Sequence, residues 1–204
     1  MKRNFVLSSL LLTLFACGQG ADLPGSQSAD SPDKISSSKS ALTNPVYTGV
    51  AVELRNRLTG LCMDVPNSSI FSGQTVWTYT CNGGPNQRWF LRHPQSCLGG
   101  NLWDYWLIPG CSNVYIENMN SGLCLDIPNG STNPDVPIQQ YPCHYGNSQL
   151  FSFGGRSAAD GGGVFIDTVI SGENLSLQAV SDHSVKQESY GGYNFLAQVW
   201  DIVE

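Results

Sequence analysis

The chain has 204 residues, of which 13% are charged, and it contains 22 glycines and 11 prolines. This composition, with β-branched and aromatic residues spread through the second half, favours short strands and turns over helices. Sixteen acidic side chains against ten basic ones give a net charge of −6, which makes a nucleic-acid-binding protein a poor hypothesis.

The first predicted element is a secretory signal peptide at residues 1–16. Lys2 and Arg3 open it, and the apolar run that follows ends at Ala16 and is too short for a confident membrane span. Removal of this segment would leave 10 − 2 = 8 basic residues against 16 acidic ones, a net charge of −8. We therefore expect an exported and still more acidic mature protein.

Cys17 follows the signal peptide directly and is a candidate for lipidation. The run from Leu14 to Cys17 resembles a bacterial lipobox, in which the cysteine is acylated and becomes the new N-terminus. Phe15 departs from that pattern, which prefers a smaller residue, and the alternative is an ordinary cleaved signal on a secreted protein. Gly18, in place of an aspartate, resembles lipoproteins that are sorted to the outer membrane. The resemblance implies a lipid anchor on Cys17 in that membrane.

Residues 17–47 are predicted to form a flexible linker. Residues 18–45 contain seven serines and no aromatic residue, so they cannot bury enough apolar surface to offset the entropy lost on ordering. We expect the globular part at residues 48–204, as one domain of ordinary size on a tether.

An internal repeat organises this globular part. The octapeptide GLCMDVPN at residues 60–67 returns as GLCLDIPN at residues 122–129, with six identities in eight. In both copies, 23 residues separate the aspartate of the octapeptide from the glutamine of a later motif. A third, weaker copy follows, so the repeats span about 48–110, 111–160 and 161–204. Three such units predict an all-β, closed or stacked architecture with pseudo-threefold symmetry.

Each repeat also carries a motif of the form Gln-x-Trp or Gln-x-Phe. The three motifs are Gln87-Arg88-Trp89, Gln149-Leu150-Phe151 and Gln198-Val199-Trp200. Together with the two LCxD blocks, they resemble the motifs of ricin B-type lectin domains over essentially all of residues 48–204. That resemblance implies a β-trefoil, in which six strands form a short barrel capped by three hairpins. The final aromatic residue of each motif is expected to be buried.

Strand alternation predicts how the first LCxD block faces its partner strand. In residues 61–65 the apolar side chains share one face, which we expect in the core, while Cys62 and Asp64 share the other. If Cys62 lies opposite Cys81 in an antiparallel pair, then Asp64 lies opposite Tyr79. The second repeat is expected to have the same register.

The six cysteines after Cys17 are predicted to form disulfides. In the third copy Ser176 and Tyr190 stand at the two repeat-cysteine positions, so both partners are missing together, which favours pairing within each of the other repeats. The last two cysteines pair by elimination, and an exported protein can keep such bonds. The expected bonds are Cys62–Cys81, Cys124–Cys143 and Cys97–Cys111. The alternative of a metal site lacks any CxxC spacing and has only scattered histidines, so we expect no metal and no cofactor.

The resemblance implies that a carboxylate, an aromatic ring and an Asn-Gln pair bind a sugar. Carboxylate oxygens accept hydrogen bonds from vicinal hydroxyls, and the ring stacks on the C–H face of a pyranose. The carried-over residues are Asp64, Tyr79, Asn86 and Gln87 in the first repeat and Asp126, Tyr141 and Gln149 in the second. Ser148 stands where the second asparagine is expected, which leaves open whether Asn147 substitutes. In the third repeat Gln178, Glu188 and Ala197 replace the key residues, so that site is expected to be inactive.

Two other roles for the carboxylates compete with sugar binding. Asp64 and Asp126 are also placed to cap the turns that begin at the following prolines, as aspartate often does. A glycosidase would need two carboxylates ~5 to 10 Å apart. These two lie in different repeats, and no Ser-His-Asp or Cys-His signature is present, so we expect no enzymatic activity and no catalytic residues.

The predicted function is a non-catalytic lectin that is tethered to the cell surface and binds galactose-type or other glycans. One alternative is a receptor-binding toxin subunit, since lipidated ricin-like subunits of cytolethal distending toxins share this layout. Another is a trefoil that docks a protein partner without binding sugar. The segment from Ser96 to Cys111 has no counterpart in the other repeats. Its aromatic residues Trp103, Tyr105 and Trp106 are expected either to plug the barrel or to contact a ligand.

Overall fold

A computed structural model describes residues 46–94, 113–155, 162–191 and 195–204. The chain divides between Ser40 and Ala41, and all described residues lie in the second part, Ala41–Glu204. The expected signal peptide, the lipidation site and nearly all of the linker lie outside the described residues. So do the expected Cys97–Cys111 bond and the aromatic residues between those two cysteines.

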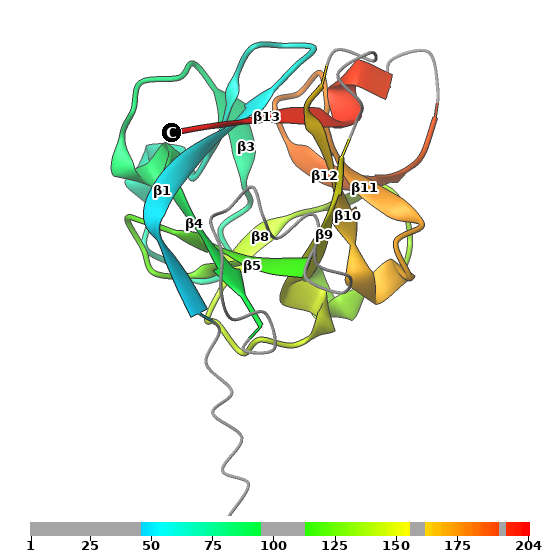
Figure 1. Ribbon diagram of the computed structural model, residues 1–204, viewed down its shortest axis with the longest axis horizontal. Coiled ribbons are helices and arrows are strands. Elements are labelled where there is room, and N and C mark those ends of the chain that lie inside the picture. Colours follow the sequence, from blue (N-terminus) through cyan, green and yellow to red (C-terminus); the bar gives the residue numbers. More distant parts are fainter. Residues whose placement is uncertain (1–45, 95–112, 156–161, 192–194) are drawn as a thin grey trace, which may run out of the picture. The chain divides into compact units, whose positions relative to one another are not determined.

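Six antiparallel strands close into a barrel, because the first strand pairs with both its neighbour β4 and the last strand, β13. The ring runs through β1, β4, β5, β9, β10 and β13 and back to β1 (Figure 1). The strands are β1 (Val46–Asn56), β4 (Trp89–His93), β5 (Asn113–Asn118), β9 (Leu150–Gly155), β10 (Val164–Thr168) and β13 (Val199–Val203). Closure gives each barrel strand a partner on both sides.

Each repeat adds one hairpin to the barrel. The hairpin strands are β2 (Cys62–Asp64) with β3 (Trp77–Tyr79), β6 (Cys124–Asp126) with β8 (Gln139–Tyr141), and β11 (Leu175–Ala179) with β12 (Val185–Ser189). A short strand, β7 (Val136–Pro137), pairs with β12. We call β1–β4 the first lobe, β5–β9 the second and β10–β13 the third. Six barrel strands and three hairpins make the fold a β-trefoil, which confirms the predicted all-β architecture.

The aromatic residues of the three Gln-x-Trp-like motifs lie in one hydrophobic core. Trp89, Phe151 and Trp200 are all 0% exposed, which confirms the prediction that they are buried. The indole N–H of Trp89 donates to the Met63 carbonyl at 3.1 Å, and that of Trp200 donates to the Leu177 carbonyl at 2.9 Å. Each indole therefore joins a barrel strand to the hairpin of its own lobe.

Short 3₁₀ turns connect several strands. They are η1 (Pro66–Ser68), η2 (Pro85–Gln87), η4 (Pro128–Gly130), η5 (Asn147–Gln149), η7 (Val169–Ser171) and η8 (Phe195–Gln198). Within η1 and η4 the asparagine of the repeated octapeptide has a φ of 55°, a left-handed conformation that asparagine tolerates well. This explains why asparagine returns at this position in both copies. None of the helices in the described part of the chain is long and apolar enough to span a membrane.

Strand β2 is buried on both faces. Met63 and Val65 lie in the core as predicted, but Leu61, which was expected with them, precedes β2 and is only half-buried. On the other face Cys62 is 0% and Asp64 3% exposed. A carboxylate at that depth needs hydrogen-bond partners, because burying an unpaired charge is costly.

The predicted register of the first hairpin is wrong by two residues. Cys62 lies opposite Tyr79 and Asp64 lies opposite Trp77. The reason is that Cys81 follows the end of β3, so the disulfide closes beyond the ladder, with 5.0 Å between its Cα atoms, and its two cysteines are not a cross-strand pair. The second hairpin has the same register as the first.

Candidate functional site

The carboxylate of Asp64 is held by three donors at the end of β2. The corrected register brings Trp77 opposite it, and the indole Nε1 donates to Oδ1 at 2.6 Å. From η2, Asn86 Nδ2 and Gln87 Nε2 both donate to Oδ2 at 2.8 Å. A carboxylate has about four lone-pair sites, so one remains for a ligand. The turns after Asp64 and Asp126 have no side-chain cap, so the turn-capping alternative is wrong.

The glutamine of each Gln-x-Trp-like motif is buried and joins its 3₁₀ turn to the hairpin of the same lobe by a hydrogen bond. Gln87, Gln149 and Gln198 are all 0% exposed, and each amide nitrogen donates to a backbone carbonyl at or directly after the end of the second hairpin strand of its lobe. The acceptors are the carbonyls of Thr80 at 2.9 Å, Pro142 at 3.0 Å and Ser189 at 2.9 Å. A fully buried amide does not meet a ligand directly. Gln87 is therefore placed to orient Asp64, to which it donates, and does not itself face solvent.

The aromatic side of the first site consists of two rings. Tyr79 is 53% exposed, and its ring stacks against Trp77 with centroids 5.9 Å apart and planes 15° from parallel. The two residues are two positions apart on β3, so their side chains share one face. Trp77 therefore contacts both the solvent-exposed ring of Tyr79 and the carboxylate of Asp64. Trp77 adds one residue to the predicted site.

The second lobe builds a similar site with different donors. Asp126 is 4% exposed and accepts from Gln139 Nε2 at 2.9 Å and from the Ser148 hydroxyl at 3.1 Å. His144 Nε2 lies 3.4 Å from the same carboxylate. Ser148 itself, rather than Asn147, thus takes the place of the expected asparagine.

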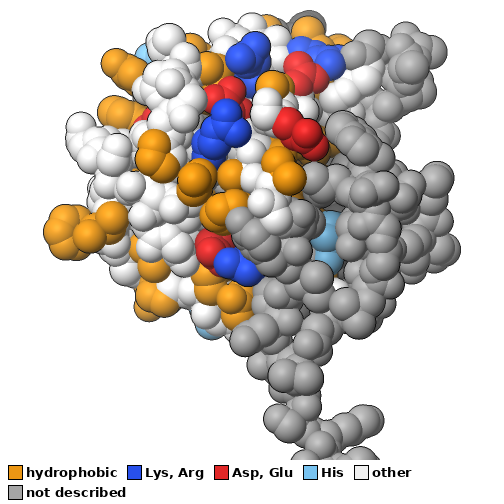
Figure 2. Space-filling view, turned by 60° about the vertical axis from the view of Figure 1, so that its left-hand side comes forward, with side chains coloured by type: hydrophobic (Ala, Val, Ile, Leu, Met, Phe, Trp, Pro, Cys, Tyr) orange, Lys and Arg blue, Asp and Glu red, His pale blue; other side chains and the backbone are white. Residues whose placement is uncertain are grey.

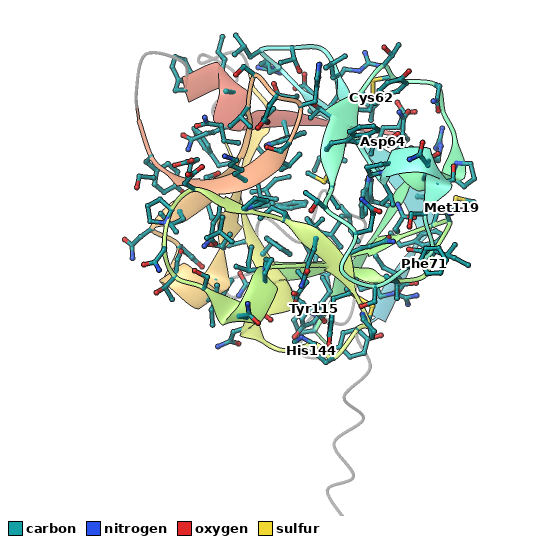
Figure 3. The ribbon with its side chains drawn as sticks, turned by 180° about the vertical axis from the view of Figure 1, so that it is seen from behind. Cys62, Asp64, Phe71, Tyr115, Met119 and His144 are labelled. Atoms are coloured by element: carbon teal, nitrogen blue, oxygen red, sulfur yellow. A yellow bond between two sulfur atoms is a disulfide. The ribbon has the colours of Figure 1, made fainter. Side chains whose placement is uncertain are left out.

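His144 and Tyr141 form the open edge of the second site. Tyr141 is 43% exposed, and its ring meets the imidazole edge-on with centroids 6.4 Å apart. The Gly146 N–H donates to His144 Nδ1 at 3.1 Å, so the proton of a neutral imidazole lies on Nε2 and points toward Asp126. Figure 3 shows His144 far from Asp64, so the two lobes carry separate sites.

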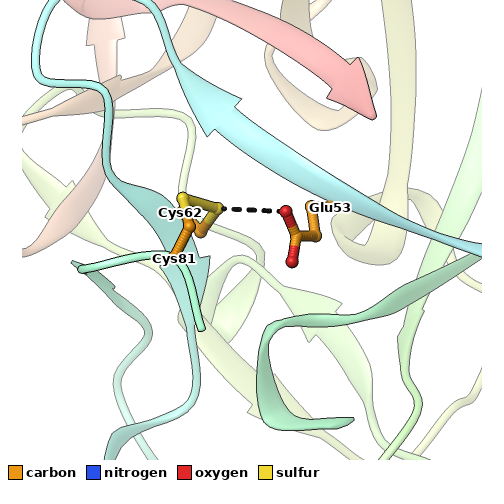
Figure 4. Close-up of side chains that lie close together, drawn as sticks. All are labelled: Glu53, Cys62 and Cys81. Atoms are coloured by element: carbon orange, nitrogen blue, oxygen red, sulfur yellow. Dashed lines mark hydrogen bonds between the residues drawn. A yellow bond between two sulfur atoms is a disulfide. The ribbon is translucent and has the colours of Figure 1, made fainter. Parts of the chain in front are cut away.

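Two of the predicted disulfides lie beside these sites. Cys62–Cys81 and Cys124–Cys143 are both present, which confirms those two pairings. A Glu53 oxygen lies 3.7 Å from the Cys62 sulfur (Figure 4), and Glu117 lies close to the second bond. Bonded sulfurs are not thiolates, so neither group offers the sulfur ligand that a zinc site would use.

Sequence reasoning missed Trp77, Gln139 and His144. The first two occupy equivalent positions, opposite the aspartate of each hairpin, and both present an N–H to it. A repeat alignment combined with the correct register would have found them. His144 has no equivalent contact in the first lobe, so the repeat carries no signal for it.

Known proteins share this architecture. The family model described as "Ricin-type beta-trefoil lectin domain-like" matches residues 42–99 and 100–195. The chain belongs to this ricin-type family. A search of curated proteins found no significant match.

Solved structures resemble this ricin-type chain in fold. ThreeFoil, a designed 3-fold symmetric protein, is 26% identical with a TM-score of 0.60 over 76% of this chain and 98% of its own. The Rhizoctonia solani agglutinin is 17% identical, with a TM-score of 0.55 over 80% and 97%. The exo-β-1,3-galactanase 1,3Gal43A from Clostridium thermocellum is 22% identical, with a TM-score of 0.58 over 76% and 30%. This chain therefore spans less than a third of that enzyme.

The third lobe of this ricin-type trefoil lacks the carboxylate of the other two. Gln178 stands at the aspartate position, opposite Lys186, and Glu188 stands opposite Ser176 at the position of the exposed tyrosines. A lysine and a glutamate provide no ring on which a sugar can stack. That the third lobe does not bind sugar stays a prediction, which rests on Gln178 and Glu188.

A polar cluster replaces the missing disulfide of the third lobe. Asp167 is 7% exposed, and its Oδ1 is buried without a hydrogen-bond partner. Burial raises the pKa of Asp167 from 3.8 to about 6, and the neighbouring side chains of Tyr190 and Ser176, the residues at the two cysteine positions, only partly oppose that shift. Burial and the nearby Asp167 carboxylate also raise the pKa of the Tyr190 phenol.

We expect Asp167→Asn to stabilise the protein at neutral pH. The folded state binds the Asp167 proton more tightly than the unfolded chain, so this residue's contribution to stability is favourable at low pH and is lost as pH rises from about 4 to 6. Allowing for solvent screening, the ionised carboxylate costs on the order of 1–2 kcal/mol above pH 6. Urea unfolding at pH 4 and 7 measures this difference. An Asn variant that is less stable than wild type at pH 7 would contradict it.

Proposed function

We propose that this chain is a non-catalytic carbohydrate-binding protein with one site in the first lobe and one in the second. The observation that carries the proposal is the pairing, in both lobes, of a donor-bound carboxylate with a half-exposed tyrosine. Asp64 with Tyr79, and Asp126 with Tyr141, combine these groups. The family match supports glycan binding as the class of function.

The chemistry of each site suits a sugar ring. The donors around Asp64 and Asp126 hold both carboxyl groups in a fixed orientation, so a remaining lone pair is placed to accept from a hydroxyl. The exposed face of each tyrosine offers the flat apolar surface that a pyranose C–H face covers. Galactose or N-acetylgalactosamine is the sugar that the family resemblance favours.

The proposed setting is the bacterial cell surface. An acylated Cys17 would anchor the chain in the outer membrane, and the serine-rich linker would let the lectin domain reach glycans outside the cell. On the face shown in Figure 2, basic side chains lie among acidic ones and do not form a continuous basic surface. Glycans or glycoconjugates therefore remain the favoured partners over nucleic acid. A toxin or other effector subunit is the alternative partner.

The exposed tyrosines test the proposal with little risk to folding. We expect Tyr79→Ala to weaken glycan binding by the first lobe and Tyr141→Ala that by the second, each about three- to tenfold, because the stacking contact is lost. Glu188→Ala changes the equivalent position of the third lobe and is expected to have no effect. A glycan array, followed by calorimetric titration of the best ligand, measures all three.

The controls separate binding from folding. Both tyrosines lie about half in solvent, so the variants are expected to unfold at the same urea concentration as wild type. If the wild-type chain binds no glycan on the array, the proposed function is wrong. If Glu188→Ala weakens binding as much as Tyr79→Ala does, the assignment of sites to lobes is wrong.

A further inference from the structure

Three symmetry-related positions at the centre of the hairpins join neighbouring lobes. Gln140 and Gln187, both 0% exposed, lie opposite Leu125 and Leu177 on the paired strands. Each amide nitrogen donates two hydrogen bonds to backbone carbonyls in a loop of the preceding lobe. The acceptors are Ser69 at 3.0 Å and Phe71 at 2.9 Å for Gln140, and Ser131 at 3.0 Å and Asn133 at 2.6 Å for Gln187.

The first lobe breaks this symmetry. Its equivalent residue is Thr78, opposite Met63, and its hydroxyl makes one hydrogen bond, to the His183 carbonyl at 3.3 Å. The loop that it meets is also shorter, since only residues 180–184 connect its two hairpin strands, where the other two hairpins have residues 65–76 and 127–138. A short side chain and a short loop therefore meet at the boundary between the first and third lobes.

A pocket lies where the symmetry is broken. Its volume is about 160 Å³, it opens to solvent, and Leu61, residues 77–80 and His183 line it. Its wall is mostly apolar. A cavity of about 150 Å³ holds a benzene molecule, so this pocket has room for one flat apolar group of that size.

The pocket adjoins the first candidate sugar site, because Tyr79 and Trp77 belong to both. We propose, resting on the function proposed above, that the first lobe recognises a sugar carrying an aromatic or similarly flat apolar substituent, which this pocket binds. In the second lobe Gln140 stands at the position equivalent to Thr78, and its buried amide donates to the Ser69 and Phe71 carbonyls of the first lobe. The two lobes therefore differ in ligand preference.

The pocket is tested first without any sugar. Fluorobenzene, followed by ¹⁹F NMR, is expected to bind the wild-type chain, and Thr78→Gln is expected to weaken that binding at least tenfold by filling the space. The variant is expected to fold, because glutamine already stands at both equivalent positions. Tyr141→Ala, in the other lobe, is the control and is expected to leave fluorobenzene binding unchanged. If fluorobenzene does not bind the wild type, or binds Thr78→Gln equally well, there is no such pocket for aromatic groups.

The link to the sugar site is tested with matched glycosides. Phenyl β-D-galactopyranoside is expected to bind about tenfold more tightly than methyl β-D-galactopyranoside, because burying the ring removes apolar area from water. Thr78→Gln should abolish that preference while leaving the affinity for the methyl galactoside unchanged. Equal affinities in the wild type would overturn the proposal even if fluorobenzene binds. If neither galactoside binds, sugar recognition of this class fails, and the fluorobenzene result still decides separately whether the pocket accepts a ring.

Discussion

Replacement of Trp200 by alanine is expected to destabilise the domain by about 4 kcal/mol, close to the loss that typically follows removal of a large aromatic side chain from a core. Trp200 is 0% exposed and belongs to the central hydrophobic cluster with Trp89 and Phe151. Its removal would leave a cavity where the three lobes meet and would also free the Leu177 carbonyl from its indole donor. Urea denaturation followed by far-UV circular dichroism measures the free energy of unfolding.

A conservative variant separates the two causes. Trp200→Phe keeps most of the volume, as Phe151 does at the equivalent place in the second lobe, but it removes the N–H. We expect it to cost about 1–2 kcal/mol, the penalty for a buried carbonyl left without its partner. Phe71→Ala, at a residue that is 75% exposed, is the control and is expected to change stability by less than about 0.5 kcal/mol. A loss below about 1 kcal/mol for Trp200→Ala would contradict the central role of this residue.

Much of the fold was predictable because the repeat is local in sequence. The octapeptide, the Gln-x-Trp-like motif and the constant spacing between them occur within each lobe, and each lobe folds around its own hairpin. The barrel closure itself depends on pairing between β1 and β13, which join the two ends of the domain. No local pattern encodes that contact, so it followed from the family resemblance.

The register error has a physical cause. A slip of two residues leaves every side chain on the same face of its strand, so the alternation of apolar and polar residues cannot detect it. The register was anchored on the assumption that bonded cysteines face each other, yet Cys81 lies past the end of β3. The error moved Tyr79 into the place of Trp77 and hid the donor that holds Asp64.

The repeat pattern of the sequence could not predict the hydrogen bonds between lobes. Thr78, Gln140 and Gln187 look unremarkable along the chain, because nothing near them marks the carbonyls that they reach in another lobe. Only the fold shows that these three residues occupy equivalent positions and that Thr78 has the shortest side chain of the three. The pocket beside Tyr79 follows from that difference.

Removal of the Cys62–Cys81 bond by a double alanine substitution is expected to cost about 3 kcal/mol. The bond joins residues 19 positions apart, and a cross-link over a loop of that length lowers the entropy of the unfolded chain by about that amount. The variant should still fold, because the third lobe forms the same hairpin with Ser176 and Tyr190 at these positions. Urea denaturation of the double variant tests the value.

The same substitution is expected to weaken the first sugar site selectively. Cys62 lies directly opposite Tyr79, so the bond holds the strand that carries the exposed ring against the strand that carries Asp64. The Cys124→Ala/Cys143→Ala variant is the matched control, since its bond joins residues with the same separation and lies next to Tyr141 instead. With Tyr141→Ala in the background, the second lobe binds more weakly and glycan titration reports chiefly on the first lobe, so only loss of Cys62–Cys81 should lower the affinity of the tighter site. Equal losses from the two disulfide variants in that background would mean that the bonds act on overall stability and not on the site beside them.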